Sequence, residues 1–259
     1  MGKYDNILIC SDLDGTLLGS DGKLSGENLE AINRFCDEGG KFCISTGRLP
    51  SHLLKFFPKE FFKSPVICCN GACIYDYNED KILYAHPLGE KKYEIYEFLE
   101  KNSDQIIRTT IFVGPTLNAC EGFKENAAWI KETLSNTIYK VVLSMQSPKA
   151  AIELRDKLTQ KFGEFFNFSR SWDTGVEILD HYATKGHTIN HLKNILGGKL
   201  ITICVGDYEN DITMIQVADI GCAVKNAVPQ LKAVADRIIC SNDEHATKYI
   251  VENICDKLI

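Results

Sequence analysis

The sequence lacks long hydrophobic runs and lacks any concentration of positive charge. No stretch of about 18 apolar residues occurs, and a transmembrane helix needs roughly that many. The chain has 29 basic and 35 acidic residues, and its lysines and arginines are scattered rather than grouped. Nucleic-acid-binding proteins carry a basic patch or stripe. We therefore expect a protein that neither spans a membrane nor binds nucleic acid.

The sequence also lacks a secretion signal and the paired cysteine motifs of a zinc site. Its first residues do not show the charged, apolar and small-residue parts of a signal peptide. There are 11 cysteines, but no second C-x-x-C pair completes a metal set. Most of them stand in apolar runs, where a free thiol behaves as a small buried hydrophobe. We expect free structural cysteines and a reducing, cytoplasmic location.

The first and last thirds of the chain alternate apolar strands with amphipathic helices. Ser25 is a candidate N-cap for a helix that ends before Gly39-Gly40. Continuous apolar strands separated by helices are typical of a parallel sheet covered on both faces. The strand candidates are residues 6–11, 41–45, 65–69, 200–207 and 219–224. This pattern predicts an α/β fold with a Rossmann-like, doubly wound parallel-sheet core.

The middle of the chain changes rhythm. Between residues 86 and 183, single helices alternate with strands in which polar residues are frequent, as expected for an α+β layer. A segment of about 100 residues is a common size for an independent unit. We therefore interpret residues 86–183 as an inserted α+β domain. Residues 1–85 and 184–259 would then form one discontinuous core.

Acidic residues follow two of the apolar strands. Asp12 and Asp14 are two positions apart in C-S-D-L-D-G-T and so can face the same side. Asp207 ends another strand, and ligands of open α/β sheets bind beyond the carboxyl ends of the strands. Each acid alone is explained equally well by a turn or a helix cap. Together, three carboxylates suit a hard cation such as Mg²⁺.

Four segments, in order, resemble the motifs of the haloacid dehalogenase-type phosphatases. They are D-L-D-G-T-L-L (12–18), S-T-G-R (45–48), K-G (185–186) and G-D-Y-E-N-D-I-T-M (206–214). N-G-A at 70–72 and K-N-A at 225–227 match signatures of the Cof-like branch, which has a large α/β (type IIB) cap. The resemblance covers nearly the whole chain, although the cap matches only in length and element order. It implies Mg²⁺-dependent hydrolysis of small phosphorylated metabolites, sugar phosphates above all, through an aspartyl-phosphate.

The resemblance also implies roles for individual residues. Asp12 would be the nucleophile, and Asp14 would protonate the leaving alkoxide and then activate water. Mg²⁺ would be held by Asp12, the backbone carbonyl of Asp14 and Asp207. The Thr46 hydroxyl and amide, together with Lys185, would bind the phosphoryl oxygens. Successive residues of a strand face opposite sides, so only one of Ser45 and Thr46 is expected to take this role.

Further residues are expected around the phosphate. Gly47, Arg48, Asn70 and Asn210 would contact it, and Asn210 and Asp211 would support the metal waters and orient Lys185. Arg48 fits a pair with a core acid equally well, because guanidinium groups serve both phosphates and carboxylates. Asn70 fits an Asx turn before Gly71 equally well.

The cap and the C-terminal loop are less specific. Arg170, Trp172, Glu177 and His181 are candidate specificity residues, weighed against packing or surface roles. The stretch Glu244-His245-Ala246 lacks the glycine common in the branch, which predicts a changed loop on the core's rim. Two other functions stay open: a phosphosugar mutase of the same superfamily, and a non-catalytic phosphate- or metal-binding regulator. The sequence carries no signal for oligomeric state.

Overall fold

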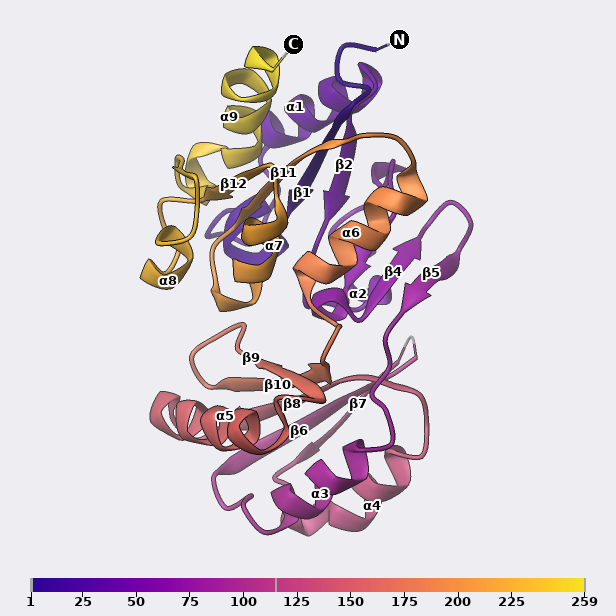
Figure 1. Ribbon diagram of the computed structural model, residues 1–259, viewed down its shortest axis with the longest axis vertical. Helices are drawn as coiled ribbons and strands as arrows, with labels where there is room; N and C mark the ends of the chain where they lie inside the picture. Colours follow the sequence, from indigo (N-terminus) through magenta and orange to yellow (C-terminus); the bar gives the residue numbers. More distant parts are fainter. Residues whose placement is uncertain (1, 115, 259) are drawn as a thin grey trace.

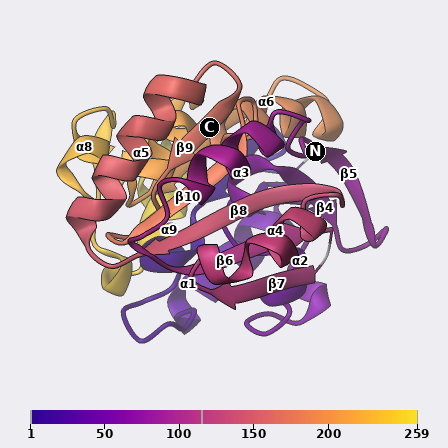
Figure 2. The same ribbon diagram turned by 90° about the horizontal axis from the view of Figure 1, so that it is seen from below.

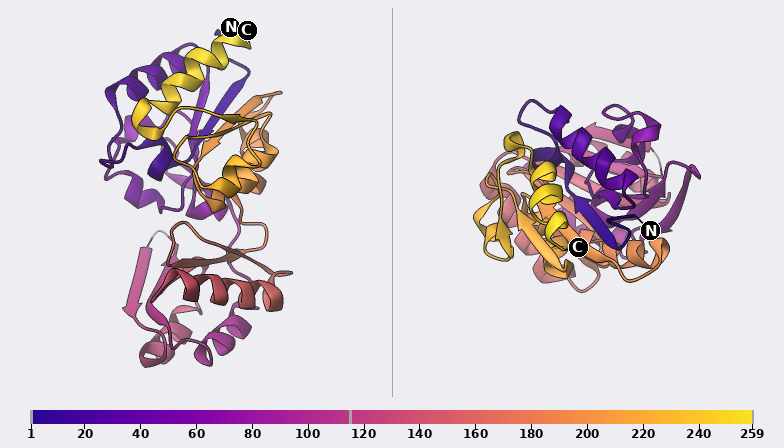
Figure 3. Two further views of the ribbon diagram at one scale, coloured as in Figure 1. Left: turned by 90° about the vertical axis from the view of Figure 1, so that its left-hand side faces the viewer. Right: turned by 90° about the horizontal axis from the view of Figure 1, so that it is seen from above.

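The computed structural model describes residues 2–114 and 116–258, and these form two units joined by two chain crossings (Figure 1). The first unit is built on a five-stranded parallel sheet with the order β13-β12-β11-β1-β2. The N- and C-terminal ends of the chain lie together at its far end (Figure 3). The strands are β1 (Ile7–Ser11), β2 (Lys41–Ile44), β11 (Ile201–Gly206), β12 (Ile220–Ala223) and β13 (Arg237–Ile238).

Helices cover both faces of this sheet, as a doubly wound fold requires. On one face α1 (Gly26–Asp37) packs on α9 (Ala246–Asn253), and on the other α6 (Lys185–Leu196) packs on α7 (Ile212–Val217) (Figure 3). The Ser25 hydroxyl caps α1 by accepting from the Asn28 amide, as expected. Two short helices complete the unit, α2 (Pro50–Leu53) and α8 (Pro229–Lys232). The predicted α/β class with a parallel sheet is confirmed.

One part of the first third departs from the alternation. The strands β3 (Val66–Cys68), β4 (Cys73–Asp76) and β5 (Lys81–Ala85) form a separate antiparallel sheet. Parallel strands need a crossover of a dozen or more residues. Here only a tight turn follows β3, in which Cys69, Asn70 and Gly71 all have positive φ. The chain therefore reverses directly, and β3 pairs with the main sheet through an isolated bridge from Ile67 to Ser45.

The second unit is an antiparallel sheet with helices on one face. Its strand order is β7-β6-β8-β10-β9, and its helices cover the side away from the first unit (Figure 1; Figure 2). The strand β7 and the helix α9 of the first unit were not expected from the sequence. The new elements are α3 (Lys92–Glu100), β6 (Ile106–Val113), β7 (Thr116–Glu121), α4 (Ala127–Thr133), β8 (Ile138–Met145), α5 (Pro148–Phe162), β9 (Phe166–Ser169) and β10 (Gly175–Asp180).

The two faces of the second sheet have different partners. Ile111, Val141 and Leu143 point into a core shared with α3, α4 and α5. Phe112 and Val142, which alternate with those residues, pack instead with the apolar cluster of the first unit. This second face is therefore turned toward the parallel sheet.

All 11 cysteines are free, and eight of them are buried. Among residues 2–114 and 116–258, no helix combines the length and apolar character that a membrane crossing demands.

Candidate active site

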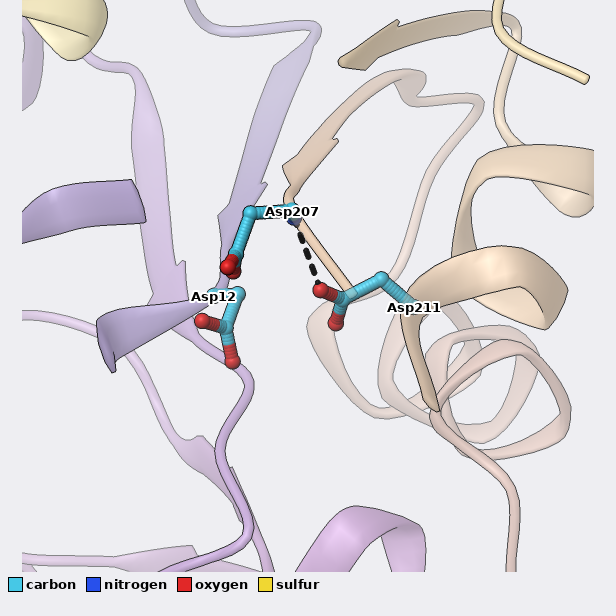
Figure 4. Close-up of side chains that lie close together, drawn as sticks. All are labelled: Asp12, Asp207 and Asp211. Atoms are coloured by element: carbon cyan, nitrogen blue, oxygen red, sulfur yellow. Dashed lines mark hydrogen bonds between the residues drawn. The ribbon is translucent and has the colours of Figure 1, made fainter. Parts of the chain in front are cut away.

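Three carboxylates meet at the carboxyl end of the parallel sheet. Asp12 follows β1 and Asp207 follows the adjacent strand β11, while Asp211 ends the short turn beginning at Glu209. One oxygen from each of Asp12, Asp207 and Asp211 lies within 4.8 Å of the others (Figure 4). The Asp12 amide donates to the Val205 carbonyl at 2.9 Å, which extends the β1–β11 register up to the site. The sheet thus brings together acids that are about 200 residues apart in sequence.

Two glycines make the close approach possible. Gly15 has φ +80°, and a Cβ there would lie 2.6 Å from Asp207 Oδ2. A Cβ on Gly206 would lie 2.5 Å from Asp211 Cγ. The turn that carries Gly15 also places the Thr16 hydroxyl, which donates to Asp207 Oδ1 at 3.0 Å. Any other residue at either glycine would push the carboxylates apart.

Lys185 is the only lysine that contacts this acid cluster in the part of the chain that the structure describes. It stands at the start of α6, and its buried Nζ lies 2.5 Å from Asp12 Oδ1 and 2.6 Å from Asp211 Oδ1. Burial by itself lowers the pKa of Lys185, but the charges of Asp12 and Asp211 outweigh burial and raise it. The ammonium group therefore stays charged across the physiological range.

The single ammonium group of Lys185 balances only part of the negative charge of the three carboxylates. Burial raises the pKa of Asp12 well above its ordinary value, and the carboxylates of Asp211 and Asp207 raise it further against the opposing effect of Lys185. Burial, followed by the charge of Asp211, raises the pKa of Asp207 to about 6. Three carboxylates beside one ammonium leave room for a divalent cation with oxygen ligands.

Asn210 supports the same conclusion about a cation. Its Oδ1 is buried and has no hydrogen-bond partner among residues 2–114 and 116–258. Its Nδ2 donates to Asn70 Oδ1 at 3.1 Å. An unpaired acceptor beside an acid cluster is suited to a water molecule on a hydrated metal. The donor set therefore fits Mg²⁺.

The Asp14 carboxylate turns away from the acid cluster. It accepts two hydrogen bonds from Arg48, at 2.8 Å from Nε and 2.7 Å from Nη2. The same guanidinium stacks over the Phe56 ring at 4.4 Å. Arg48 therefore pairs with an acid of the core, which is one of the two partners expected for it. Asp14 also lines the cavity described below.

The loop after β2 differs in one detail from the expectation. The Thr46 amide donates to the Ile67 carbonyl at 2.9 Å, so it is engaged in the backbone and is not free for a phosphate. The Thr46 hydroxyl remains at the cavity, where it accepts from the Arg48 amide at 3.2 Å. Ser45 Oγ, the alternative candidate, is buried without a partner among the described residues and does not line the cavity.

Asn70 connects the two units. It has φ +56°, and its Nδ2 donates to the Glu177 carboxylate and, at 3.1 Å, to the Ser171 hydroxyl. A Cβ on Gly47 would lie 3.0 Å from Asn70 Oδ1, so the side chain fits against that glycine. Asn70 is therefore both the left-handed turn residue and a polar contact to the second unit.

A buried ion pair of the second unit reaches the same loop. Lys140 Nζ lies 2.9 Å from Glu177 Oε1 and donates to the Gly47 carbonyl at 2.8 Å. Both side chains are almost fully buried. Sequence reasoning named Glu177 but missed Lys140. The signal was present, since I-Y-K-V-V-L and G-V-E-I-L each place one charge inside an apolar strand, with opposite signs.

Further bridges hold the turn that carries Asp211. Glu209 pairs with Arg155 of α5 at 3.1 Å and with Arg170 at 2.5 Å. The Tyr208 hydroxyl donates to Asp173 Oδ1 at 2.7 Å. Arg155 and Tyr208 were not identified from the sequence.

The four candidates at the end of the second unit have different environments. Arg170 bonds Glu209 and does not line the cavity, whereas Trp172 and Glu177 do line it. His181 is exposed, and its Nδ1 lies 3.2 Å from the Gly163 carbonyl on another part of the surface.

A cavity of about 450 Å³ lies between the units. The wall from the first unit contains residues that were predicted for catalysis, metal binding or phosphate binding. Asn70, Lys185 and Asp211 were predicted for the same site but lie behind this wall and do not line the cavity. Its second-unit wall comes mainly from β6 and β8. The lining residues from the first unit include Asp12, Asp14, Thr46, Gly47, Arg48, Asp207 and Asn210.

The altered C-terminal loop keeps a left-handed residue without glycine. His245 has φ +62° and is the residue from which α9 begins. Its Nδ1 lies 3.0 Å from Ser25 Oγ, and its Nε2 lies 3.6 Å from Glu27 Oε1. Side-chain contacts therefore hold a conformation that glycine adopts without a side chain.

The chain is similar to known proteins over most of its length. Residues 9–250 match the sequence model of the haloacid dehalogenase-like hydrolases. The chain is 27% identical to the phosphatase YwpJ of Bacillus subtilis, over 95% of this chain and 99% of YwpJ. It is 26% identical to the pyridoxal phosphate phosphatase YbhA of Escherichia coli, over 91% and 93% of the two chains.

Among solved structures, the HAD subclass IIB sugar phosphatase BT4131 has the same fold. The TM-score is 0.78 at 19% identity, with 94% of this chain and 97% of the other covered. The resemblance drawn from the four motifs, to the Cof-like branch, is confirmed by these matches.

Proposed function

The chain belongs to the haloacid dehalogenase-like hydrolase family, and on that premise we propose that it is a Mg²⁺-dependent phosphatase of small phosphorylated metabolites. The observation that carries the proposal is the acid cluster with Lys185 at the end of the parallel sheet. A carboxylate oxygen of Asp12 lies within hydrogen-bonding distance of the Lys185 ammonium group, and Asp12 also lines the cavity. The relatives named as phosphatases support the same reaction class.

The first chemical step is transfer of the phosphoryl group to the protein. A carboxylate oxygen of Asp12 attacks phosphorus, and the bond from phosphorus to the metabolite's oxygen breaks. Lys185 neutralises charge on the transferring phosphoryl oxygens, and the Thr46 hydroxyl donates to one of them. We assign Gly47, Asn70 and Asn210 to positioning this loop and its waters.

The second residue of the pair handles the proton. Asp14 protonates the departing alkoxide, then takes a proton from the water that attacks the aspartyl-phosphate and releases inorganic phosphate. In the structure two hydrogen bonds from Arg48 hold the Asp14 carboxylate. We therefore propose that the substrate phosphate competes for Arg48, which frees Asp14 to take up a proton from solvent and to turn into the cavity.

Magnesium fits the remaining groups. Asp12, Asp207 and the Asp14 backbone carbonyl would hold the ion, and Asn210 and Asp211 would bind its waters or orient Lys185. The bound ion supplies charge that offsets repulsion between an anionic nucleophile and an anionic substrate. The protein residues do the remaining work of binding, orienting and proton transfer.

We propose that residues 86–183 act as a cap on a core made of residues 1–85 and 184–259. Closing such a unit over a site excludes water and completes the contacts to the substrate. The hydrogen bonds from Lys140 to the Gly47 carbonyl and from Asn70 to the Glu177 carboxylate support this role. Among small phosphorylated metabolites, we propose sugar phosphates as the leading class of substrate. We propose a cytoplasmic location because the cysteines are free.

The test is phosphate release by the purified protein from a panel of phosphorylated metabolites, with Mg²⁺ and with excess chelator. We expect turnover that requires Mg²⁺, and the same ion should raise the unfolding temperature by binding only the folded state. Asp207→Asn should remove both effects. Transfer of phosphate between two hydroxyls of one sugar would instead support a mutase, and ligand binding without turnover would support a regulator.

A further inference from the structure

Four of the six histidines gather near the place where the chain passes between the two units (Figure 1). His86 follows β5 at the first crossing, His181 follows β10 at the second, and His187 and His191 stand on α6. The ring centroids of His86 and His187 are 5.7 Å apart, and those of His187 and His191 are 4.9 Å apart. The proposed phosphatase reaction uses none of these side chains.

His187 and His191 bring the same ring nitrogen of each side chain together. They are four positions apart on α6, and residues four apart lie on the same face of a helix. His187 Nε2 is 3.1 Å from His191 Nε2. Two imidazole nitrogens that bind one tetrahedral Zn²⁺ at about 2.0–2.1 Å stand about 3.3 Å apart. The spacing in the structure is therefore close to that of two ligands of one metal ion.

Neighbouring groups hold this pair in place. The Tyr84 ring stacks on the His191 ring at a centroid distance of 3.9 Å, and the Tyr84 hydroxyl lies 3.4 Å from His187 Nε2. The His187 amide donates to the Thr184 hydroxyl, which caps α6. Burial, followed by the neighbouring imidazoles of His191 and His86, lowers the pKa of His187. Its ring is therefore neutral near pH 7, as a metal ligand must be.

The space and the charge beside the pair suit a bound cation. A second cavity, of about 420 Å³, opens onto His187 and is also lined by His181 and Thr184. Such a cavity leaves room for the waters that complete the coordination of a metal with few protein ligands. The Asp180 carboxylate lies 3.5 Å from His86 Nδ1, and its negative charge also acts on His187. That charge attracts a cation to the pair.

We propose that His187 and His191 form a second metal site, for a divalent transition-metal ion of the Zn²⁺ or Ni²⁺ class. Imidazole nitrogen suits these ions, whereas Mg²⁺ prefers oxygen ligands, so this site and the acid cluster select different metals. Among residues 2–114 and 116–258, no third histidine, cysteine or acid joins this pair with all ligand atoms within 4.8 Å of one another. The protein therefore supplies two ligands, and water supplies the others.

The second metal site lies beside both chain crossings. The contact of His86 with Asp180 joins the first crossing to the second. The Tyr182 ring, also on the second crossing, has its centroid 5.3 Å from that of His187. Lys185, which bonds two acids of the cluster, precedes His187 by two residues on α6. An ion bound here joins two turns of α6 next to both crossings and stabilises the folded protein.

The test is calorimetric titration of Ni²⁺ into the purified protein in excess Mg²⁺, repeated in the Asp207→Asn variant to remove the acid cluster as a competing site. We expect Ni²⁺ binding in both proteins and an unfolding temperature that rises with Ni²⁺ concentration. His187→Gln and His191→Gln should each weaken binding at least about tenfold, since even loss of an outer-shell partner costs roughly 10- to 100-fold. Glutamine is a good helix former, so both variants should keep α6.

His245→Gln is the matched control, because His245 is also partly buried but contacts Ser25 on the rim of the core. Its Ni²⁺ affinity should stay within about twofold of the parent's, as for a substitution away from the site. No Ni²⁺ binding, or equal affinity in the parent and both α6 variants, would overturn the site. The short distance would then be a hydrogen bond between two neutral rings. Two separate ligand variants keep the test decisive if circular dichroism shows that one of them does not fold.

Discussion

The two walls of the cavity solve different physical problems. The wall from the parallel sheet carries Asp12 and Asp207, and Asp211 and Lys185 lie directly behind it, with Lys185 bonding Asp12 and Asp211. The wall from the antiparallel sheet mixes apolar and polar side chains, and its buried ion pair, Lys140 with Glu177, reaches Gly47 of the first unit. Under the proposed function, the first wall acts on the phosphate and the second contacts the group to which the phosphate is attached. Changes to the two walls should therefore have different effects.

The largest expected effect is the loss of the nucleophile from the first wall. Asp12→Asn should lower kcat/KM by roughly 10⁴-fold or more for every substrate alike, because no step can bypass the covalent intermediate. Phosphate release and circular dichroism would measure activity and folding together. A residual rate within tenfold of the parent protein would contradict the covalent mechanism.

Breaking the ion pair of the second wall should affect stability most. Lys140→Met leaves the Glu177 carboxylate buried without its cation, which costs about 3–5 kcal/mol in the free energy of unfolding. Urea denaturation measures this loss. Lys149→Met is the matched control, since Lys149 is exposed on α5 and pairs only loosely with Glu153. The double variant Lys140→Met, Glu177→Leu should recover much of the loss, and equal losses in single and double variants would contradict this account.

Arg48 gives an intermediate effect on the first wall. Arg48→Lys keeps the charge but cannot make the two parallel bonds to Asp14. We expect kcat/KM to fall about 10- to 100-fold, the range of one charge-assisted contact, and by the same factor for every substrate. Arg34→Lys on α1 is the control. A loss of activity confined to one class of substrate would indicate that Arg48 contacts the leaving group rather than the phosphate.

The smallest effect is expected far from both walls. His245→Gly relieves a left-handed residue but removes the contact to Ser25, and glycine adds flexibility to the unfolded chain. These opposing contributions should leave the free energy of unfolding within about 1 kcal/mol of the parent. Turnover should be unchanged. A strong loss of activity would show that this loop affects the acid cluster.

Much of the first wall was predictable because its residues follow strands directly. Asp12 and Asp207 end apolar runs, and parallel strands place their carboxyl ends together. Lys185 and Thr46 were identified through contiguous motifs. The engaged Thr46 amide was not foreseeable, because it depends on β3 lying beside the end of β2, and β3 joins an antiparallel hairpin.

The second wall was mostly hidden in the sequence. Its residues alternate along β6 and β8, and the strand pattern gives two faces without saying which one meets the acids. β7 was missed because T-L-N-A-C-E is a largely exposed edge strand with weak alternation. Lys140 and Glu177 stand 37 residues apart, and only the register of β8 with β10 brings them together.

The sequence by itself determined the reaction chemistry of this protein. Short motifs fix which residues carry the acids, the lysine and the hydroxyl, and local strand and turn geometry orients them. The tertiary structure alone decided the partners of these groups: Arg48 bonds Asp14, Lys140 bonds Gly47, and the β6–β8 strand pair lies opposite the acids. The reason is physical, since a side chain's type is local information whereas its neighbour across a sheet or between two units is set by packing.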